Sequence, residues 1–138
     1  MSVWIEVETT VNAPLEKVWR MWTEAEHICQ WCQATADWHA PYAENNLEVG
    51  KTFKTTMAAK DGSAQFDFEG TYVSIKPYEH IEYHITDGRR VSILFTNTGA
   101  DTVHILEGFE AELLNEPALQ QAGWQAILDS FRTYAEQV

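Results

Sequence analysis

The chain of 138 residues suits one domain, covering residues 1–138, and its hydrophobic content of 45% excludes a disordered protein. Nine Lys and Arg residues stand against 21 Asp and Glu residues, and the net charge of −12 argues against nucleic acid or an anionic membrane as a partner. No apolar run approaches the roughly 20 residues of a membrane helix. No basic and apolar leader opens the chain, so we expect a cytoplasmic protein.

The first third of the chain predicts one strand and two short helices. Apolar and polar residues alternate over residues 3–11, as in a strand with one buried face. Asn12-Ala13-Pro14 then opens a helix, because proline is tolerated in a first helical turn. Thr23 with Glu26 fits a capping box, which predicts that a second short helix begins there.

The middle of the chain predicts antiparallel strands. We expect a short strand over residues 34–39, followed by a long loop that begins near Pro41. From residue 51 to residue 109, segments of period-two alternation are separated by turn signals such as Asp61-Gly62. Several antiparallel strands joined by hairpins follow from this pattern.

One of these segments changes its period. Phe66 and Phe68 share one face, whereas Val73 and Ile75 fall on the opposite parity. A bulge at Gly70 would explain the change, since one extra residue in a strand shifts the alternation by one position.

Residues 116–136 predict a long C-terminal helix that starts at Asn115-Glu116-Pro117. A curved antiparallel sheet wrapped around this helix is an α+β fold in which sheet and helix cover each other's apolar faces. Such an arrangement can leave a cavity, which the six Trp, five Tyr and six Phe residues would line. The helix carries one apolar stripe, formed by Leu119, Trp124, Ile127, Leu128, Phe131 and Ala135.

Motifs spread over nearly the whole chain carry a family resemblance: Ala13-Pro14-Leu15-Glu16-Lys17-Val18-Trp19, Glu26-His27-Ile28 with Trp31, Asp37-Trp38-His39 with Pro41, Ala43-Glu44-Asn45, Val49-Gly50, Phe66-Asp67-Phe68-Glu69-Gly70-Thr71-Tyr72 and Gly123-Trp124-Gln125-Ala126-Ile127-Leu128. They resemble the START-like (SRPBCC, helix-grip) superfamily. Within it they are similar to small bacterial proteins related to the C-terminal domain of the heat-shock-protein ATPase activator and to the polyketide cyclase-like group. One departure is Lys51, where many relatives have a second glycine.

The resemblance implies a helix-grip (START-like, Bet v-like) fold: a curved antiparallel β-sheet wrapped around a long C-terminal helix, with two short helices after the first strand. It also implies a deep apolar cavity under that helix. It does not by itself establish a chemistry, because this superfamily includes carriers, cyclases and co-chaperone domains.

Glu107 is the sharpest chemical feature, because parity places it with Val103, Ile105 and Phe109 on the inward face of the last strand. A carboxylate on that face needs a partner or becomes neutral. It therefore becomes a candidate general acid/base or a polar anchor for a ligand. A position at the sheet edge, where the side chain reaches water, is the competing interpretation.

The histidines and cysteines indicate a function less clearly than Glu107 does. His39 follows Trp38 and is expected to close a loop, with a ligand contact as the alternative. Cys29 and Cys32 have C-x-x-C spacing, but a zinc site would also require His27 and His39 to converge on them. We therefore expect two ordinary reduced thiols, with no metal and no cofactor.

The aromatic residues divide between core and pocket. Trp19 and Trp22 are expected in the core, whereas Trp124 on the last helix is a candidate for the pocket wall. Gly123 beside it costs roughly 1 kcal/mol in a helix, and close packing is the simplest reason for it.

Three functions stay open. The first is binding of a small hydrophobic or aromatic ligand, with a homodimer as an open alternative to a monomer. The second is a cofactor-independent enzyme of the cyclase or hydratase type that uses Glu107, Tyr83 and His39, and the third is a co-chaperone-like interaction domain. The predicted ligand-binding residues are Trp38, His39, Phe53, Met57, Phe66, Phe68, Tyr83, Phe95, Glu107, Trp124, Leu128 and Phe131.

Overall fold

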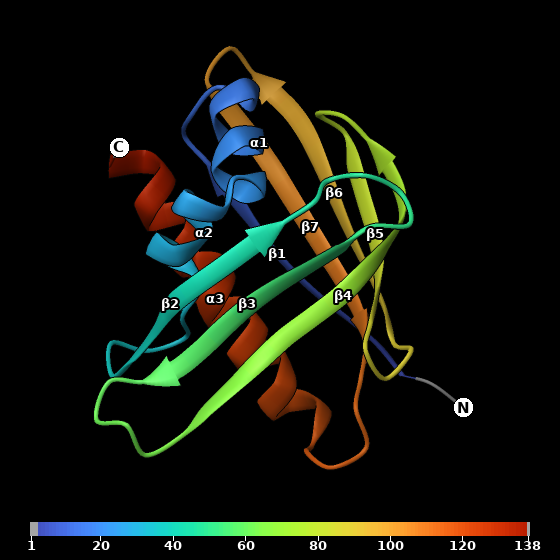
Figure 1. The fold of residues 1–138 in the computed structure, drawn as a ribbon. Helices are drawn as coiled ribbons and strands as arrows, with labels where there is room; N and C mark the ends of the chain where they lie inside the picture. Colours follow the sequence, from blue (N-terminus) through green and yellow to red (C-terminus); the bar gives the residue numbers. More distant parts are fainter. Residues whose placement is uncertain (1–2, 138) are drawn as a thin grey trace.

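The computed structural model describes residues 3–137, in which one curled sheet packs against a long helix (Figure 1). Among these residues, no helix combines the length and the apolar character that a membrane crossing requires. The elements follow one another along the chain as β1 (Trp4–Val11), α1 (Leu15–Thr23), α2 (Ala25–Trp31), β2 (Trp38–Asn45), β3 (Thr52–Ala59), β4 (Gln65–Lys76), β5 (His80–Ile85), β6 (Arg90–Gly99), β7 (Thr102–Glu110) and α3 (Pro117–Gln137).

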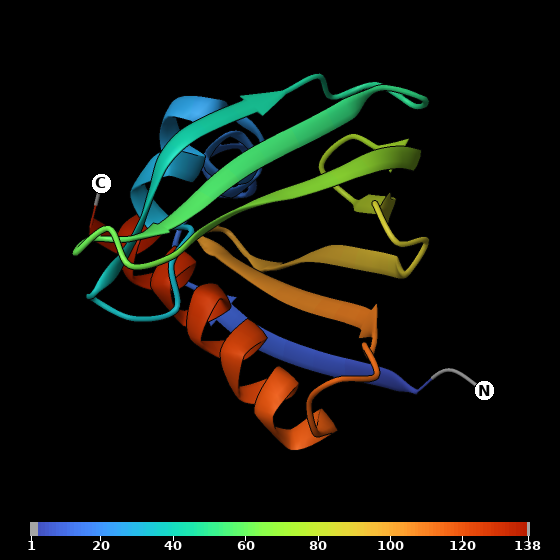
Figure 2. The same cartoon turned by 60° about the horizontal axis from the view of Figure 1, so that its bottom comes forward.

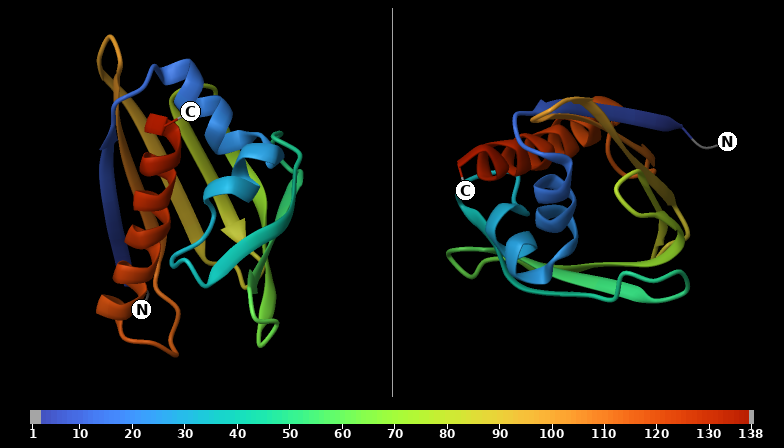
Figure 3. Two further views of the ribbon diagram at one scale, coloured as in Figure 1. Left: turned by 90° about the vertical axis from the view of Figure 1, so that its left-hand side faces the viewer. Right: turned by 90° about the horizontal axis from the view of Figure 1, so that it is seen from above.

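The strands form one antiparallel sheet in the order β1-β7-β6-β5-β4-β3-β2. Seen from above, the sheet curls into an incomplete ring, and α3 lies across its open side (Figure 3). Helix α3 packs mainly on β1, and α2 packs on β2 at the other edge of the sheet. This arrangement confirms the predicted helix-grip fold.

Strand β1 has the predicted alternation, with Ile5, Val7, Thr9 and Val11 buried and the residues between them exposed. In α3, which begins at Pro117 as predicted, Leu128 and Phe131 are fully buried. Leu119 departs from the predicted stripe: it is 63% exposed, because the first turns of α3 extend beyond the sheet's packed inner face.

The strand near residue 38 is longer and later than predicted. Strand β2 spans Trp38–Asn45, so the segment expected to be a loop is paired with β3 instead. Pro41 lies inside this strand, where the pairing with β3 is irregular between His39 and Tyr42. Because β2 is an edge strand, a residue without a backbone N–H is tolerated there.

The predicted bulge at Gly70 lies elsewhere. The register with β5 shifts between Tyr72 and Ser74, so Val73 points outward and is 37% exposed. Gly70 has a different role: a Cβ at this position would stand 2.6 Å from a ring carbon of Phe53 and 2.9 Å from the carbonyl oxygen of His84.

The capping box between Thr23 and Glu26 is not formed. The Thr23 hydroxyl donates to the carbonyl oxygen of Trp19 at 2.8 Å, and Glu24 begins α2 without a side-chain cap. His27, expected at an exposed position, is half-buried, and its ring nitrogen lies 2.7 Å from the Tyr134 hydroxyl. The contact between His27 and Tyr134 joins α2 to α3.

A pair of glycine substitutions tests this packing. Gly70→Ala is expected to lower the free energy of unfolding by about 1–3 kcal/mol, because the Phe53 ring must move and the His84 carbonyl cannot. Gly123→Ala is the matched control. No atom lies within 4 Å of a Cβ at residue 123, so this variant is expected to raise the free energy of unfolding by about 0.5–1 kcal/mol. Urea unfolding measures both, and equal effects of the two variants would contradict the assignment.

Candidate ligand-binding cavity

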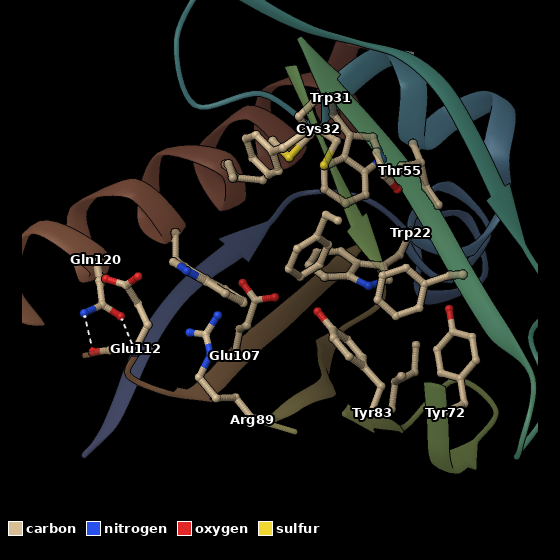
Figure 4. Close-up of a pocket in the computed structure, with 18 of the residues that line it drawn as sticks. Trp22, Trp31, Cys32, Thr55, Tyr72, Tyr83, Arg89, Glu107, Glu112 and Gln120 are labelled. Atoms are coloured by element: carbon tan, nitrogen blue, oxygen red, sulfur yellow. Dashed lines mark hydrogen bonds between the residues drawn. The ribbon is translucent and has the colours of Figure 1, made fainter. Parts of the chain in front are cut away.

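A cavity of about 370 Å³ lies between the inner face of the sheet, α2 and α3 (Figure 4). Strands β3, β4, β5 and β7 supply its walls on the sheet side, because every second residue of these strands points inward. Its lining residues are Trp22, Ile28, Trp31, Cys32, Phe53, Thr55, Met57, Phe66, Phe68, Tyr72, Ile81, Tyr83, Arg89, Glu107, Glu112, Asn115, Gln120, Trp124 and Ile127.

The cavity continues into a surface groove, with which it shares Met57, Phe66, Trp124 and other wall residues. The groove adds Thr35 from the α2–β2 loop and Leu119 from the first half of α3. Figure 2 shows α3 lying along β1, and the groove lies between α3 and residues of the α2–β2 loop, β3 and β4. Since Leu119 and Phe66 are both more than half exposed, this side is the mouth of the cavity.

Eight of the nineteen lining residues are aromatic. Phe53 stands at their centre: its ring centroid lies 4.7 Å from that of Tyr83, 5.4 Å from that of Tyr72 and 5.7 Å from that of Phe68. On the opposite wall, the Trp124 indole stacks on Phe109 with a centroid distance of 3.9 Å and an interplanar angle of 11°. Such contacts fix the ring orientations, so the walls are preformed.

Glu107 lies in this apolar surrounding as parity predicted. It is 7% exposed, and its strand neighbours in register are Val7 on β1 and Ile93 on β6. Burial raises the pKa of its carboxyl group from 4.5 to about 8, and no neighbouring cation offsets this effect. At neutral pH the carboxyl group is therefore mostly protonated and can both donate and accept a hydrogen bond.

Tyr83 and Cys32 share the space around Glu107. Figure 4 shows the Glu107 carboxyl and the Tyr83 hydroxyl pointing toward the same part of the cavity. Burial, followed by the charge of Glu107, raises the pKa of the Tyr83 hydroxyl well above its usual value. The same two causes, followed by the charge of Cys29, raise the pKa of the Cys32 thiol to about 12, so the thiol is neutral. Three neutral polar groups thus face one region.

A polar cluster closes one end of the cavity. The Gln120 side chain is 8% exposed and donates to the carbonyl oxygens of Asn115 at 2.7 Å and Glu112 at 3.2 Å. Its oxygen accepts from the Glu112 backbone N–H at 2.9 Å. Gln120 thereby holds the β7–α3 loop against the helix, as the dashed lines in Figure 4 show.

Arg89 is the cation in the lining. Its Nε donates to the Asp87 carboxylate at 2.8 Å, and a terminal nitrogen donates to the Glu110 carbonyl oxygen at 3.3 Å. The predicted site residues included neither Arg89, which the sequence offered only as a possible partner of Glu107, nor Gln120. A polar residue beside an apolar helical stripe was a usable signal for Gln120, whereas nothing in the Asp87-Gly88 turn indicates where Arg89 points.

The structure brings most of the predicted site residues together. Trp38 lines the groove at the mouth rather than the cavity itself. The cavity lining contains Phe53, Met57, Phe66, Phe68, Tyr83, Glu107 and Trp124.

Four predicted residues lie outside both the cavity lining and the groove. Phe95 packs against Trp19 and Trp22, with centroid distances of 5.2 and 5.7 Å, and belongs to the core. Leu128 and Phe131 are fully buried, and Phe131 packs against the rings of Trp22 and Trp31 with centroid distances of 4.9 Å. His39 is exposed on β2, because alternation turns it away from the side that Trp38 occupies.

The remaining sequence features have local explanations. Cys29 and Cys32 are free thiols, and within the described residues they do not cluster with His27 and His39. Gly123, expected to allow close packing, instead lines the groove with open space beside it.

A sequence model of the family described as Activator of Hsp90 ATPase homolog 1-like protein matches residues 12–136. The AHSA1-like protein of Aeromonas hydrophila is 40% identical and has a TM-score of 0.90, and the match covers 97% of this chain and 92% of that one. A protein of Cytophaga hutchinsonii is 57% identical, with a TM-score of 0.82 and coverage of 96% and 91%.

More distant structures share the fold alone. DynU16, from the dynemicin biosynthetic locus, is 17% identical with a TM-score of 0.74, and the match covers 97% of this chain and 47% of that one. Among curated proteins, none matches the chain significantly. The family match and the structural neighbours confirm the predicted START-like relationship.

The buried carboxyl makes stability depend on pH. A raised pKa in the folded state means that folding opposes ionisation, so the penalty is absent below pH 4.5 and grows until pH 8. Glu107→Gln removes this penalty. The free energy of unfolding of the variant is expected to exceed that of the native protein by on the order of 3 kcal/mol at pH 7.

Urea unfolding at pH 5, 6, 7 and 8 measures the difference. Glu69→Gln is the control, since Glu69 is exposed on β4 and lies outside the cavity. The difference in free energy of unfolding between Glu107→Gln and the native protein is expected to grow from pH 5 to pH 8. A constant difference would show that Glu107 ionises as freely in the folded chain as in the unfolded one.

Proposed function

The chain belongs to the Activator of Hsp90 ATPase homolog 1-like family, and on this premise we propose that it binds a small apolar or aromatic molecule in the cavity under α3. The observation that carries the proposal is a cavity of about 370 Å³, open at its mouth, with aromatic walls and few polar groups. Pockets for small ligands have this size and character, in which apolar walls give affinity and a few polar groups give orientation.

Glu107 and Tyr83 are the polar anchors in this proposal. Both face the cavity from β7 and β5, and within residues 3–137 no side chain forms a hydrogen bond or ion pair with the Glu107 carboxyl or the Tyr83 hydroxyl. A ligand group that reaches them would supply hydrogen-bond partners that the described side chains do not provide. The free thiols of Cys29 and Cys32 suit a reducing compartment, and we therefore place this binding in the cytoplasm.

A cofactor-independent enzyme of the cyclase or hydratase type is the second candidate. The convergence of Glu107 and Tyr83 favours it, because a carboxylic acid with a pKa near 8 is suited to proton transfer at neutral pH. His39 has no part in this candidate, since its side chain is exposed on β2. Turnover of a bound substrate that is lost in Glu107→Gln while binding persists would separate enzyme from carrier.

A co-chaperone-like interaction domain is the third candidate. It draws on the family's description and on two adjacent leucines, Leu113 and Leu114, which are 97% and 91% exposed in the loop before α3. Stimulation of a heat-shock ATPase by this chain, lost in a Leu113→Ser/Leu114→Ser double variant, would support it over small-molecule binding.

Blocking the mouth tests the proposed binding. Gly123→Trp places a large side chain in the groove, where no atom lies within 4 Å of the new Cβ. The affinity for the neutral dye Nile red is expected to fall at least about tenfold, the equivalent of about 1.4 kcal/mol. Gly123→Ala is the matched control and is expected to bind the dye as the native chain does.

Fluorescence titration gives the affinity and the stoichiometry, for which one dye per chain is expected. Circular dichroism checks that both variants are folded. Native mass spectrometry of freshly purified protein looks for a co-purified molecule. Absence of dye binding by the native chain, or equal binding by Gly123→Trp, would overturn the proposal.

A further inference from the structure

The buried carboxyl of Glu107 has no counter-ion within the described residues. The cavity lining contains one cation, Arg89, and its guanidinium is engaged by the Asp87 carboxylate at 2.8 Å and by the carbonyl oxygen of Glu110. Buried carboxylates in proteins are normally paired with a cation or bound to a metal. A cationic ligand can therefore supply the partner that the described residues do not provide.

We propose that the ligand is an organic cation, an apolar or aromatic amine whose ammonium group pairs with the Glu107 carboxylate while its body fills the aromatic part of the cavity. This inference rests on the proposed binding function and specifies the chemical class of the ligand.

The aromatic walls support the choice of a cation. Trp22, Phe53, Tyr72 and Tyr83 all line the cavity that holds Glu107. The faces of such rings are electron-rich and attract ammonium groups, most strongly where water is excluded. A carboxylate among aromatic rings thus combines two attractions for the same group, and the Tyr83 hydroxyl oxygen offers the ammonium a hydrogen-bond acceptor.

Charge favours a cation over an anion. The chain carries a net charge of −12, which raises the local concentration of cations. Glu112 adds a second carboxylate to the lining, where it accepts hydrogen bonds from Asn115 at 2.7 Å. An anionic ligand would meet both carboxylates and would have to compete with Asp87 for Arg89.

Binding of an ammonium group must change the protonation of Glu107. The ionisable groups that face the cavity are Cys32 from α2, Tyr72 from β4, Tyr83 from β5, Arg89 from the β5–β6 turn, Glu107 from β7 and Glu112 from the β7–α3 loop. Burial raises the pKa of the first three, so they stay neutral at pH 7. Glu107 is mostly protonated in the empty cavity and ionises when the cation arrives, which releases close to one proton per ligand at pH 7.

Three probes of the same shape test the inference: 1-naphthylmethylammonium, the neutral 1-naphthylmethanol and the anion 1-naphthoate. Isothermal titration calorimetry at pH 7 gives each affinity, and titrations in phosphate and in Tris buffer give the number of protons released. The ammonium is expected to bind at least about tenfold more tightly than the alcohol, as a desolvated cation contact implies.

Two variants assign the preference to one group. Glu107→Gln keeps the shape of the side chain but is expected to abolish both the preference for the ammonium and the proton release, while the alcohol still binds. Glu69→Gln removes the same charge from the outer face of β4 and is expected to change neither.

The outcomes separate this inference from the proposed function. If the alcohol or the naphthoate binds as tightly as the ammonium, or if the preference survives in Glu107→Gln, the ligand class is wrong while the binding function stands. If none of the three probes binds, both the ligand class and the binding function fail.

Discussion

The curl of the seven-stranded sheet is the constraint on which the rest of this structure depends. A sheet that curls this far encloses more space than one helix can fill, and α3 packs mainly against β1 at one edge. The residual space is filled at one end by α1 and α2, where Trp22 and Trp31 both contact Phe131 with centroid distances of 4.9 Å. Within the described residues, no helix fills the other end of the curled sheet, and the cavity remains there.

The two ends of α3 therefore differ in their energetics. Around Leu128, Phe131 and Ala135 the helix is in dry, close-packed contact, which is where burial of apolar area stabilises the fold. Around Gln120 and Gly123 the helix is held by hydrogen bonds to a loop and borders open space. Stability is concentrated at one end, and the binding function is assigned to the other.

This division explains why the fold tolerates a buried carboxyl group. In the close-packed end, Glu107 would be an unpaired polar group in a medium that cannot respond to it. Beside the cavity it faces space that a ligand can enter, and protonation limits the cost while that space is empty. A group that weakens the folded state at neutral pH is the kind of feature that binding sites retain, because the ligand rather than the chain completes its surroundings.

Sequence reasoning determined the elements whose residues repeat with a clear period. Alternation placed β1 and the inward face of β7, including Glu107, and helical spacing placed α3 from its start at Pro117. It failed at β2, where an edge strand accepts Pro41. It also placed the bulge of β4 at Gly70 instead of near Val73, because a change of parity shows that a residue is inserted but not at which position.

Only the tertiary structure decided which inward residues face the cavity and which lie in the core. Phe53 and Phe95 are both inward-facing aromatic residues, yet Phe53 lines the cavity and Phe95 packs against Trp19 and Trp22. Arg89 and Gln120 reach the cavity through a turn and a loop contact that have no period at all. Periodicity states which face of an element a residue occupies, but the position of that face along the curled sheet is set by contacts between segments far apart in the chain.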